Sequence, residues 1–568
     1  MGSNLSYACG PSDTPLMYTT VGRMFDETVA RYPDHDAITV CHQDIHWSYK
    51  QLKQQVDACA AGLIKLGLKP GERVGIWSPN NIEWVITQFA TAKAGLILVN
   101  INPAYRRFEL EYALRISGCS ALIFAEAFKS SDYVAMVQEL LPEIDSCRIG
   151  ELASEKLPDL RLIAVISDKP STKFLRFSDI AKEADEASYA CLNRLADQMQ
   201  PDEPINIQFT SGTTGVPKGA TLSHHNIVNN GYFVAKRQKF TDVDKLCIPV
   251  PLYHCFGMVM GVLGCVSHGA SMVFPSEAFE AEATLKAIAR EKCTALYGVP
   301  TMFIAELDEP TFFDHDLSQL RTGVMAGSPC PAEVMKRVIK DMHMKDITIA
   351  YGMTETSPVS FQSAPDGPFD KRVSSVGKVM PFVEVKIIDE AGHTLARGNQ
   401  GELVTRGYSV MQGYWGDKTR TAEAIDAAGW MHTGDLAVMD AHGYAAITGR
   451  LKDMIIRGGE NIYPREIEEF LYTHPAIADA QVFGLPDTRL GETVAVWVKL
   501  KTDQTLNAHE LRDFCEGQIA HYKIPAYIKF VQDFPMTVTG KIRKFVMREQ
   551  TLEEFKKSDQ AERIQHVQ

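Results

Sequence analysis

Residues 208–219 combine the residue types that can hold a polyphosphate. The segment reads Gln-Phe-Thr-Ser-Gly-Thr-Thr-Gly-Val-Pro-Lys-Gly. Glycines let backbone N–H groups approach phosphate oxygens, hydroxyls add donors, and a lysine adds positive charge. Gly219 follows Lys218 where the common nucleotide hydrolases carry Ser or Thr, so we expect a different use of ATP. The predicted phosphate-binding residues are Thr210, Ser211, Gly212, Thr213, Thr214, Gly215 and Lys218.

A second polar segment, Tyr351-Gly352-Met353-Thr354-Glu355-Thr356, combines an aromatic ring, a glycine, hydroxyls and one carboxylate. Mg²⁺ is usually held by one or two carboxylates together with phosphate oxygens of the substrate. Beside a phosphate loop, Glu355 is therefore a candidate Mg²⁺ ligand, and it is the only protein ligand that we predict.

The elements that must position these residues alternate between helical and strand-like patterns. We expect a helix at 21–32, a pair of short strands at 37–40 and 45–48, a helix at 52–66 and a buried strand at 73–77. Such alternation predicts largely parallel sheets covered by helices. The polar stretch from Lys182 to Asp202 is interpreted as a connector leading into the phosphate loop.

The pattern changes towards β-structure from about Val373, and a polar break occurs around Lys452. Beyond the break, Pro464 is expected to open a helix within a compact α+β region. We therefore predict an α/β protein with a large N-terminal domain, residues 1–451, of αβ-layered and mostly parallel sheets plus a small β-subdomain. A small α+β C-terminal domain, residues 452–568, follows.

The composition excludes several classes of protein. The formal net charge of −13 argues against a nucleic-acid-binding protein, which would usually carry a basic surface. The longest apolar runs are shorter than the roughly 18 residues of a spanning helix, so we expect no integral membrane segment. The twelve cysteines are scattered without a C-x-x-C pair, and no signal or transit segment is apparent. We therefore expect a cytoplasmic protein.

Together these motifs resemble the adenylate-forming (AMP-binding) superfamily, which includes acyl-CoA synthetases, aryl-CoA ligases, luciferases and peptide-synthetase adenylation domains. The resemblance covers roughly Val21 to Lys544, with the motifs in the family's order, and is greatest to the medium-chain acyl-CoA synthetase branch. It implies that Tyr351 lies against adenine, that Thr354 lies near the α-phosphate, and that Asp435 binds the ribose. The other nucleotide contacts implied are Gly327, Ser328, Pro329, Gly352, Arg450 and Lys541.

The same resemblance implies the catalytic residues. His254, within Pro-Leu-Tyr-His-Cys-Phe-Gly, would contact the reacting carboxylate or the α-phosphate. Lys541, within Thr-Val-Thr-Gly-Lys, would stabilise the charge that develops during adenylation. Thr354 and Glu355 complete the catalytic set. Gly458 and Gly459 would line the tunnel for the pantetheine arm of CoA.

The reaction implied has two steps, in which ATP and a carboxylic acid give acyl-AMP and pyrophosphate, and CoA then gives acyl-CoA and AMP. The resemblance also implies that the C-terminal domain is mobile and rotates about a hinge at Lys452 between the steps. Glycine at 352 suggests an acyl pocket longer than acetate requires, so medium-chain fatty acids are favoured. The predicted pocket residues are Tyr253, Tyr297, Val299, Pro300, Met302 and Gly352.

Several alternatives stay open at this point. The acyl group could be loaded onto a carrier protein instead of CoA, or the acid could be long-chain or aryl. A luciferase-like oxygenase and a non-catalytic nucleotide sensor are further alternatives; the sensor is disfavoured because it would not need Lys541. The chain could be a monomer or a homodimer.

Overall fold

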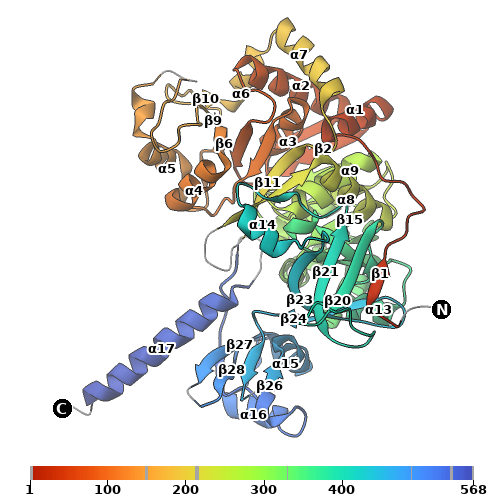
Figure 1. Cartoon of the computed structure of the whole chain (residues 1–568), viewed down its shortest axis with the longest axis vertical. Helices are drawn as coiled ribbons and strands as arrows, with labels where there is room; N and C mark the ends of the chain where they lie inside the picture. The colour runs from red at the N-terminus through yellow and green to blue at the C-terminus, as the bar shows by residue number, and fades with distance from the viewer. Residues whose placement is uncertain are drawn as a thin grey trace. The chain divides into compact units, whose positions relative to one another are not determined.

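The computed structural model describes residues 4–147, 151–210, 217–328, 330–458, 460–487, 489–537 and 542–565 (Figure 1). The chain forms two compact units. The larger comprises Ala8–Val385 and Thr405–His432, and the smaller comprises Met1–Tyr7, Lys386–Val404 and Thr433–Gln568.

The first sheet of the larger unit has eight strands in the order β10-β9-β6-β4-β5-β11-β12-β22. The neighbours from β10 to β11 are parallel, whereas β12 pairs antiparallel with both β11 and β22. Its central parallel strands β4, β5, β6 and β9 are mostly buried and apolar, as expected for a parallel sheet covered on both faces. The bounds are β4 (Arg73–Trp77), β5 (Ile97–Asn100), β6 (Cys119–Ala125), β9 (Leu162–Ile166), β10 (Leu175–Arg176), β11 (Pro204–Thr210), β12 (Lys218–Ser223) and β22 (Gly413–Tyr414).

The second sheet of the larger unit has nine strands in the order β19-β18-β17-β16-β15-β13-β14-β2-β3. The six strands from β17 to β2 are parallel, and antiparallel strands complete both edges. The bounds are β2 (Asp36–Val40), β3 (Ile45–Ser48), β13 (Lys245–Cys247), β14 (Ser271–Phe274), β15 (Ala295–Gly298), β16 (Thr322–Ala326), β17 (Asp346–Gly352), β18 (Val359–Gln362) and β19 (Lys378–Val379). The short strands β7 (Ala127–Phe128) and β8 (Ser131–Asp132) form a separate ribbon.

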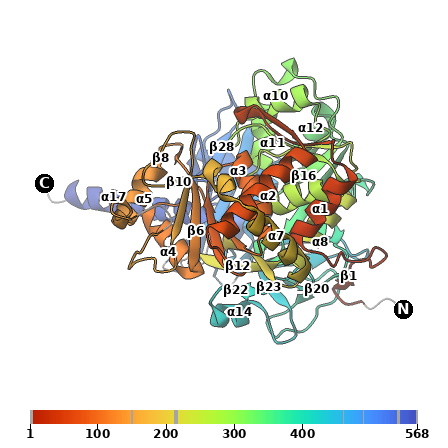
Figure 2. The same ribbon diagram turned by 90° about the horizontal axis from the view of Figure 1, so that it is seen from above.

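Helices cover these sheets, and both ribbon views show α1, α2 and α3 grouped together (Figures 1 and 2). Local sequence explains where they begin: the Ser48 side chain caps α2 in a capping box with Gln51, and the Asn81 side chain caps α3. The bounds are α1 (Val21–Arg31), α2 (Tyr49–Lys65), α3 (Ile82–Lys93), α4 (Arg107–Ser117), α5 (Tyr133–Leu140), α6 (Phe177–Ile180), α7 (Glu186–Gln198), α8 (His224–Arg237), α9 (Gly264–His268), α10 (Ala281–Glu291), α11 (Pro300–Leu307), α12 (Ala332–Asp341), α13 (Phe369–Ser374) and α14 (Lys418–Ala424).

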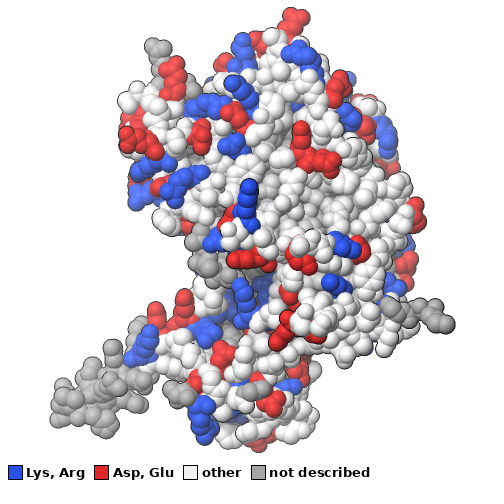
Figure 3. Space-filling model, viewed as in Figure 1, with Lys and Arg blue, Asp and Glu red and all other residues white. Residues whose placement is uncertain are grey.

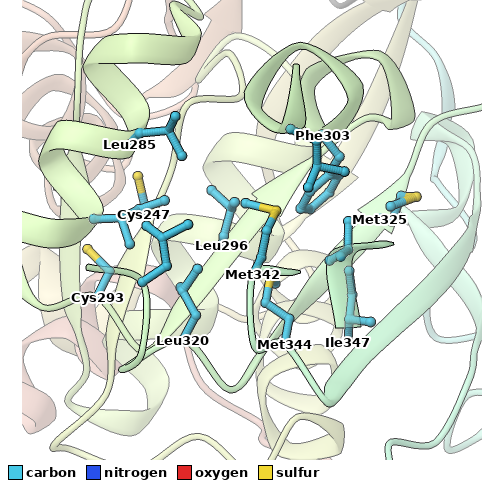
Figure 4. Packing of buried hydrophobic residues seen from close by; sticks show 14 of the residues in the cluster. Cys247, Leu285, Cys293, Leu296, Phe303, Leu320, Met325, Met342, Met344 and Ile347 are labelled. Atoms are coloured by element: carbon cyan, nitrogen blue, oxygen red, sulfur yellow. The ribbon is translucent and has the colours of Figure 1, made fainter. Parts of the chain in front are cut away.

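One hydrophobic core of the larger unit lies between the second sheet and helices α10, α11 and α12 (Figure 4). Leu296 and Ile347 come from strands, whereas Leu285 and Phe303 come from helices, and all four are fully buried. On the visible surface of the chain, basic and acidic side chains are interspersed (Figure 3). Lys53, for example, forms ion pairs with both Asp26 and Asp57.

The smaller unit contains an α+β region whose sheet has the order β26-β25-β28-β27, with β29 parallel to β28. Helix α15 begins with proline and buries Ile467 and Leu471 on one face, as predicted. The bounds are β25 (Ile455–Arg457), β26 (Glu460–Ile462), α15 (Pro464–Leu471), β27 (Ile477–Asp487), β28 (Gly491–Leu500), α16 (Ala508–Cys515), β29 (Tyr527–Phe530) and α17 (Lys544–Gln565). A further sheet, in the order β1-β20-β21-β23-β24, comprises β1 (Tyr7–Cys9), β20 (Val383–Ile388), β21 (Gly401–Gly407), β23 (Met431–Met439) and β24 (Ala445–Arg450).

The predicted α/β class is confirmed, as are the helix near 21–32 and the strand pair that became β2 and β3. The interpretation of 182–202 as a connector was wrong, because helix α7 occupies most of it. Asp185 caps this helix together with Ser188, and Leu192 is buried. The domain boundary at Lys452 stays a prediction.

Candidate active site

The predicted phosphate loop joins two antiparallel strands. β11 ends at Thr210 and β12 begins at Lys218, and these two residues are direct partners across the ladder. Because opposite residues of an antiparallel pair share a face, the register brings the hydroxyl and the ammonium to the same end of the hairpin. The predicted residues Ser211, Gly212, Thr213, Thr214 and Gly215 lie outside the described residues.

Glu355 lies in a short 3₁₀ turn, Thr354–Thr356, that closely follows β17. The chain reverses tightly here, because a Cβ on Gly352 would lie 1.8 Å from the carbonyl oxygen of Pro358. Backbone packing therefore requires glycine at this position. The backbone carbonyl of Glu355 accepts the N–H of Met411 at 2.9 Å, which fixes the turn against the segment preceding β22.

The Glu355 side chain is 5% exposed and receives two hydroxyl donors on the same oxygen. Tyr414 Oη donates to Oε1 at 2.9 Å, and Thr210 Oγ1 donates to it at 3.3 Å. The Lys218 ammonium lies 4.8 Å from the centroid of the Tyr414 ring. Burial, with the neighbouring Glu355 carboxylate as the next cause, raises the pKa of Tyr414, so its hydroxyl remains a donor.

The Glu355 carboxylate fits a role as a Mg²⁺ ligand. Among the described residues, both hydrogen bonds to the side chain end on Oε1, which leaves Oε2 for a cation. A hard cation such as Mg²⁺ takes carboxylate and phosphate oxygens, and Lys218 and Thr210 supply the positive charge and the donor that a phosphate needs nearby. The residues present are therefore chemically suited to a magnesium–phosphate group.

His254 precedes a fully buried π-helix, Phe256–Leu263. Its Nδ1 accepts the backbone N–H of Phe256 at 3.2 Å, so a neutral imidazole carries its proton on Nε2. The adjacent Cys255 thiol donates to Gln208 Oε1 at 2.9 Å. Burial raises the pKa of this thiol to about 12, and the Thr354 side chain partly offsets the shift. Cys255 therefore connects the His254 segment to β11 by a hydrogen bond and lies near the Glu355 turn.

The residues predicted to enclose adenine lie at the ends of two neighbouring parallel strands. Ala326 of β16 and Ala350 of β17 are partners in the ladder, so Gly327, which follows β16, and Tyr351, near the end of β17, lie at the same edge of the sheet. In open α/β sheets this carboxyl edge is where ligands usually bind. Gly327 has φ +93°, a conformation that favours glycine. Ser328 follows it, and Pro329 lies outside the described residues.

Four of the predicted acyl-pocket residues lie at the end of β15 and in the helix that follows it: Tyr297, Val299, Pro300 and Met302. Tyr297 is fully buried, its hydroxyl accepts Gln238 Nε2 at 2.7 Å, and its ring centroid lies 5.6 Å from that of Phe256. Val299 immediately precedes α11 and is 3% exposed. Of the other residues, Pro300 and Met302 are buried in α11, and Tyr253 is half-buried. Because packing by itself requires glycine at 352, the pocket length inferred from that residue stays a prediction.

The predicted ribose contacts lie in the smaller unit. Asp435 of β23 and Arg450 of β24 are partners in an antiparallel ladder, and Arg450 Nε lies 3.0 Å from Asp435 Oδ1. Asp435 is 8% exposed, whereas the Arg450 side chain is 69% exposed. The β23–β24 register thus forms a carboxylate–guanidinium pair of the type that binds sugar hydroxyls and phosphate.

The remaining predicted residues also belong to the smaller unit. Lys452 lies in a turn after β24. Gly458, with φ +60°, lies in the two-residue connection of the β25–β26 hairpin, in which Arg457 pairs with Glu460. Gly459 and Lys541 lie outside the described residues. The tunnel, hinge and adenylation roles stay predictions.

Tyr414 is the site residue that the sequence reasoning missed. It lies 59 positions from Glu355 in the chain, and no motif linked the two. The only local signal was a Gly-Tyr-Trp run at 413–415, which a strand also explains.

No helix in the described part of the chain is long and apolar enough to cross a membrane.

The chain belongs to the AMP-binding enzyme family. The family's "AMP-binding enzyme" region matches residues 25–415, and its "AMP-binding enzyme C-terminal domain" matches residues 466–541. The superfamily expected from the motifs is thereby confirmed.

Within this family, the individual relatives below carry the names of enzymes that join a carboxylic acid to CoA. The chain is 48% identical to "Putative acyl-CoA synthetase YngI" of Bacillus subtilis (strain 168), over 95% of this chain and 98% of that protein. It is 45% identical to the mitochondrial medium-chain acyl-CoA ligase ACSF2 of Mus musculus, over 97% and 91%. Among solved structures, the anthranilate CoA ligase AuaEII in complex with anthranoyl-AMP matches with a TM-score of 0.82 at 28% identity, over 95% of this chain and 98% of that one.

Proposed function

We propose that this protein is an ATP-dependent fatty acid–CoA ligase that forms acyl-AMP and pyrophosphate, and then acyl-CoA and AMP. The observation that carries the proposal is a chain of contacts: Thr210 and Tyr414 both donate to Glu355, and the Tyr414 ring lies beside the Lys218 ammonium. This arrangement provides a hydroxyl, an ammonium and a cation-binding carboxylate at one end of a hairpin. Membership of the AMP-binding family supplies the chemical context.

In the first step a carboxylate oxygen of the acid attacks the α-phosphorus of ATP, and the bond to the bridging oxygen of the β-phosphate breaks to release pyrophosphate. When bound, Mg²⁺ neutralises charge on the phosphate oxygens. Glu355 would hold the ion, while Thr210 and Lys218 bind phosphate oxygens. His254 would donate from Nε2 towards the carboxylate or the α-phosphate. Lys541 would stabilise the charge that develops there.

In the second step the CoA sulfur attacks the acyl carbonyl carbon. The bond to the AMP oxygen breaks, AMP leaves, and the thiol proton passes to solvent. Asp435 and Arg450 would hold the nucleotide through the ribose, while Gly458 and Gly459 would admit the pantetheine arm. We infer that rotation about Lys452 exchanges Lys541 for this glycine turn between the steps.

Medium-chain fatty acids are the proposed acyl substrates. Relatives named medium-chain acyl-CoA ligase are 44–47% identical over 96–97% of the chain. The predicted pocket wall is apolar at Val299, Pro300 and Met302, which suits an alkyl chain. Long-chain and aryl acids remain the alternatives among CoA ligases.

The experiment that tests the function measures pyrophosphate, AMP and acyl-CoA from ATP, CoA and straight-chain acids from acetate to palmitate, with benzoate and a cinnamate included. We expect CoA-dependent activity that peaks at intermediate length. Pyrophosphate without acyl-CoA would move the acceptor to a carrier protein, and no pyrophosphate with any acid would refute the proposal.

The role of Lys541 gives a separate prediction. Lys541→Ala should abolish acyl-AMP formation and largely spare thioester formation from supplied acyl-AMP, because only the first step needs its charge at the α-phosphate. Lys499→Ala is the matched control, since Lys499 is an exposed lysine of the same unit, 2.9 Å from Asp533. Both half-reactions should stay unchanged in the control. Equal loss of both half-reactions in Lys541→Ala would rule out the assignment.

We further propose that the enzyme works in the cytoplasm and uses Mg²⁺ as a cofactor. All twelve cysteines lie among the described residues as reduced thiols, which suits a reducing compartment. The relative from Bacillus subtilis is compatible with this location, whereas the ACSF2 relatives are named mitochondrial. Fractionation of the source cells tests the location.

A further inference from the structure

A short segment of the larger unit, Ser409–Trp415, connects the two parts of the candidate phosphate site. We call it the strap. On one side it contacts the Glu355 turn: the Ser357 hydroxyl donates to the carbonyl of Ser409 at 2.7 Å, and the Met411 N–H donates to the Glu355 carbonyl. The strap therefore fixes the backbone of the turn that bears the carboxylate.

On its other side the strap pairs with β12, the strand that leaves the phosphate loop. Tyr414 is the ladder partner of Ala220, and the Trp415 N–H donates to the carbonyl of Gly219 at 2.8 Å. The Gln412 N–H donates to the carbonyl of Thr221 at 2.9 Å. Backbone hydrogen bonds therefore hold the strap against the residues that immediately follow Lys218.

Tyr414 is the residue of the strap whose side chain reaches the chemical groups of both parts. It is 8% exposed, its hydroxyl donates to Glu355 Oε1 at 2.9 Å, and its ring lies 4.8 Å from the Lys218 ammonium. Its backbone N–H is satisfied separately by Thr421 Oγ1 at 2.9 Å. A buried hydroxyl donating to a carboxylate fixes both the position and the orientation of that carboxylate.

We propose that Tyr414 is a positioning residue for the adenylation step, which holds Oε1 of Glu355 so that Oε2 faces Mg²⁺ and holds the Lys218 ammonium against its ring. The inference rests on the proposed function for its chemistry, although metal binding tests it independently of turnover. Tyr414 touches neither reacting atom in this role. Its effect passes through Glu355 and Lys218.

The hydroxyl and the ring make separable contributions. Tyr414→Phe removes the donor while keeping the ring beside Lys218, so the Glu355 carboxylate loses orientation but the ammonium keeps its contact. Tyr414→Leu removes both. A hydrogen bond to a charged group and a cation–π contact each contribute a modest free energy. Loss of the hydroxyl should therefore weaken metal binding about tenfold. Loss of the ring should add about a fivefold rise in KM for ATP.

The test measures Mn²⁺ binding by paramagnetic resonance in the presence of a non-hydrolysable ATP analogue, alongside pyrophosphate release as a function of Mg²⁺. In Tyr414→Phe we expect the Kd for Mn²⁺ and the half-saturating Mg²⁺ to rise about tenfold. The rate at saturating Mg²⁺ should largely recover. Thioester formation from supplied acyl-AMP should change less than about twofold, because that half-reaction makes no use of the oriented carboxylate.

Tyr408→Phe is the matched control. Tyr408 directly precedes the strap and is half-buried, and its hydroxyl has no hydrogen-bond partner by distance and angle among the described residues. Its metal binding should match that of the wild type. An unchanged Kd for Mn²⁺ in Tyr414→Phe would overturn the inference, as would equal loss of both half-reactions together with a lowered Tm. Wild-type protein that binds Mn²⁺ and nucleotide but releases no pyrophosphate would instead count against the proposed function.

Discussion

Two buried glutamates of the larger unit have opposite surroundings. Glu355 is 5% exposed and lies in a turn beyond the carboxyl end of a strand, where Tyr414 and Thr210 donate to it. Glu306 is 1% exposed and lies in α11, and neither of its carboxylate oxygens has a hydrogen-bond partner in the described part of the chain. Its helix neighbours Phe303 and Leu307 both belong to the hydrophobic core shown in Figure 4.

The difference has an electrostatic consequence. Burial raises the pKa of Glu306 well above its ordinary value, so the folded protein favours the protonated, neutral form of this side chain over the ionised one. Burial of a carboxylate alone therefore does not mark a catalytic site. Hydroxyl donors and a nearby ammonium distinguish the carboxylate that is suited to a metal.

The largest expected effect separates the two glutamates by activity. Glu355→Gln should lower acyl-AMP formation by about 10²- to 10³-fold, because the metal-facing charge is lost. The amide oxygen can still accept from Tyr414, so the Tm should change little. Pyrophosphate release and thioester formation from supplied acyl-AMP are the two measurements.

Glu306→Gln is the control for that experiment, because it makes the same change at the other buried glutamate. Its adenylation rate should stay within about twofold of the wild type, since burial already disfavours a charge on the Glu306 carboxyl. A similar loss of adenylation in Glu355→Gln and Glu306→Gln would contradict the distinct role of Glu355. It would show that changing any buried glutamate lowers the adenylation rate.

The next effect concerns stability as a function of pH. In the unfolded chain Glu306 ionises around the ordinary glutamate pKa of 4.5, whereas the folded side chain stays protonated to a higher pH. The wild type should therefore lose free energy of unfolding relative to Glu306→Gln as pH rises above 4.5, by up to about 1.4 kcal/mol per pH unit. Urea denaturation of both proteins from pH 5 to pH 7 measures this difference. A pH-independent gap would mean that Glu306 is ionised in the folded protein.

The smallest expected effect is the loss of stability caused by the two Glu306 carboxyl oxygens, which have no hydrogen-bond partner among the described residues. At pH 4.5, Glu306→Met should raise the free energy of unfolding by about 1–3 kcal/mol, because it removes two unsatisfied polar atoms and keeps similar volume. The denaturation midpoint is the measurement. A lower midpoint would indicate that a partner satisfies the Glu306 carboxyl and that its environment is not apolar.

The sequence predicted much of the fold because local patterns specify local structure. The strand pair of β2 and β3 and the start of α15 at Pro464 were predicted near their observed positions. The stretch around α7 was misinterpreted because its polar composition hid a helix with one buried face, although Asp185 marks its beginning. The motif around Gly458 could be read as a hairpin turn, and the structure contains that turn.

The sequence alone determined which chemical groups the site contains. Thr210, Lys218 and Glu355 were identified by residue type and motif, because phosphate and magnesium chemistry restricts which side chains can serve. The order of the motifs identified the family, and the comparisons confirmed it.

Only the tertiary structure decided how those groups are held. The Tyr414–Glu355 hydrogen bond joins residues 59 positions apart, and the ladder between β12 and β22 creates it. The raised pKa of Glu306 likewise depends on apolar residues brought together from several helices and strands. Hydrogen bonds and desolvation act over a few ångströms in space, so they are set by which distant segments pack together rather than by neighbours along the chain.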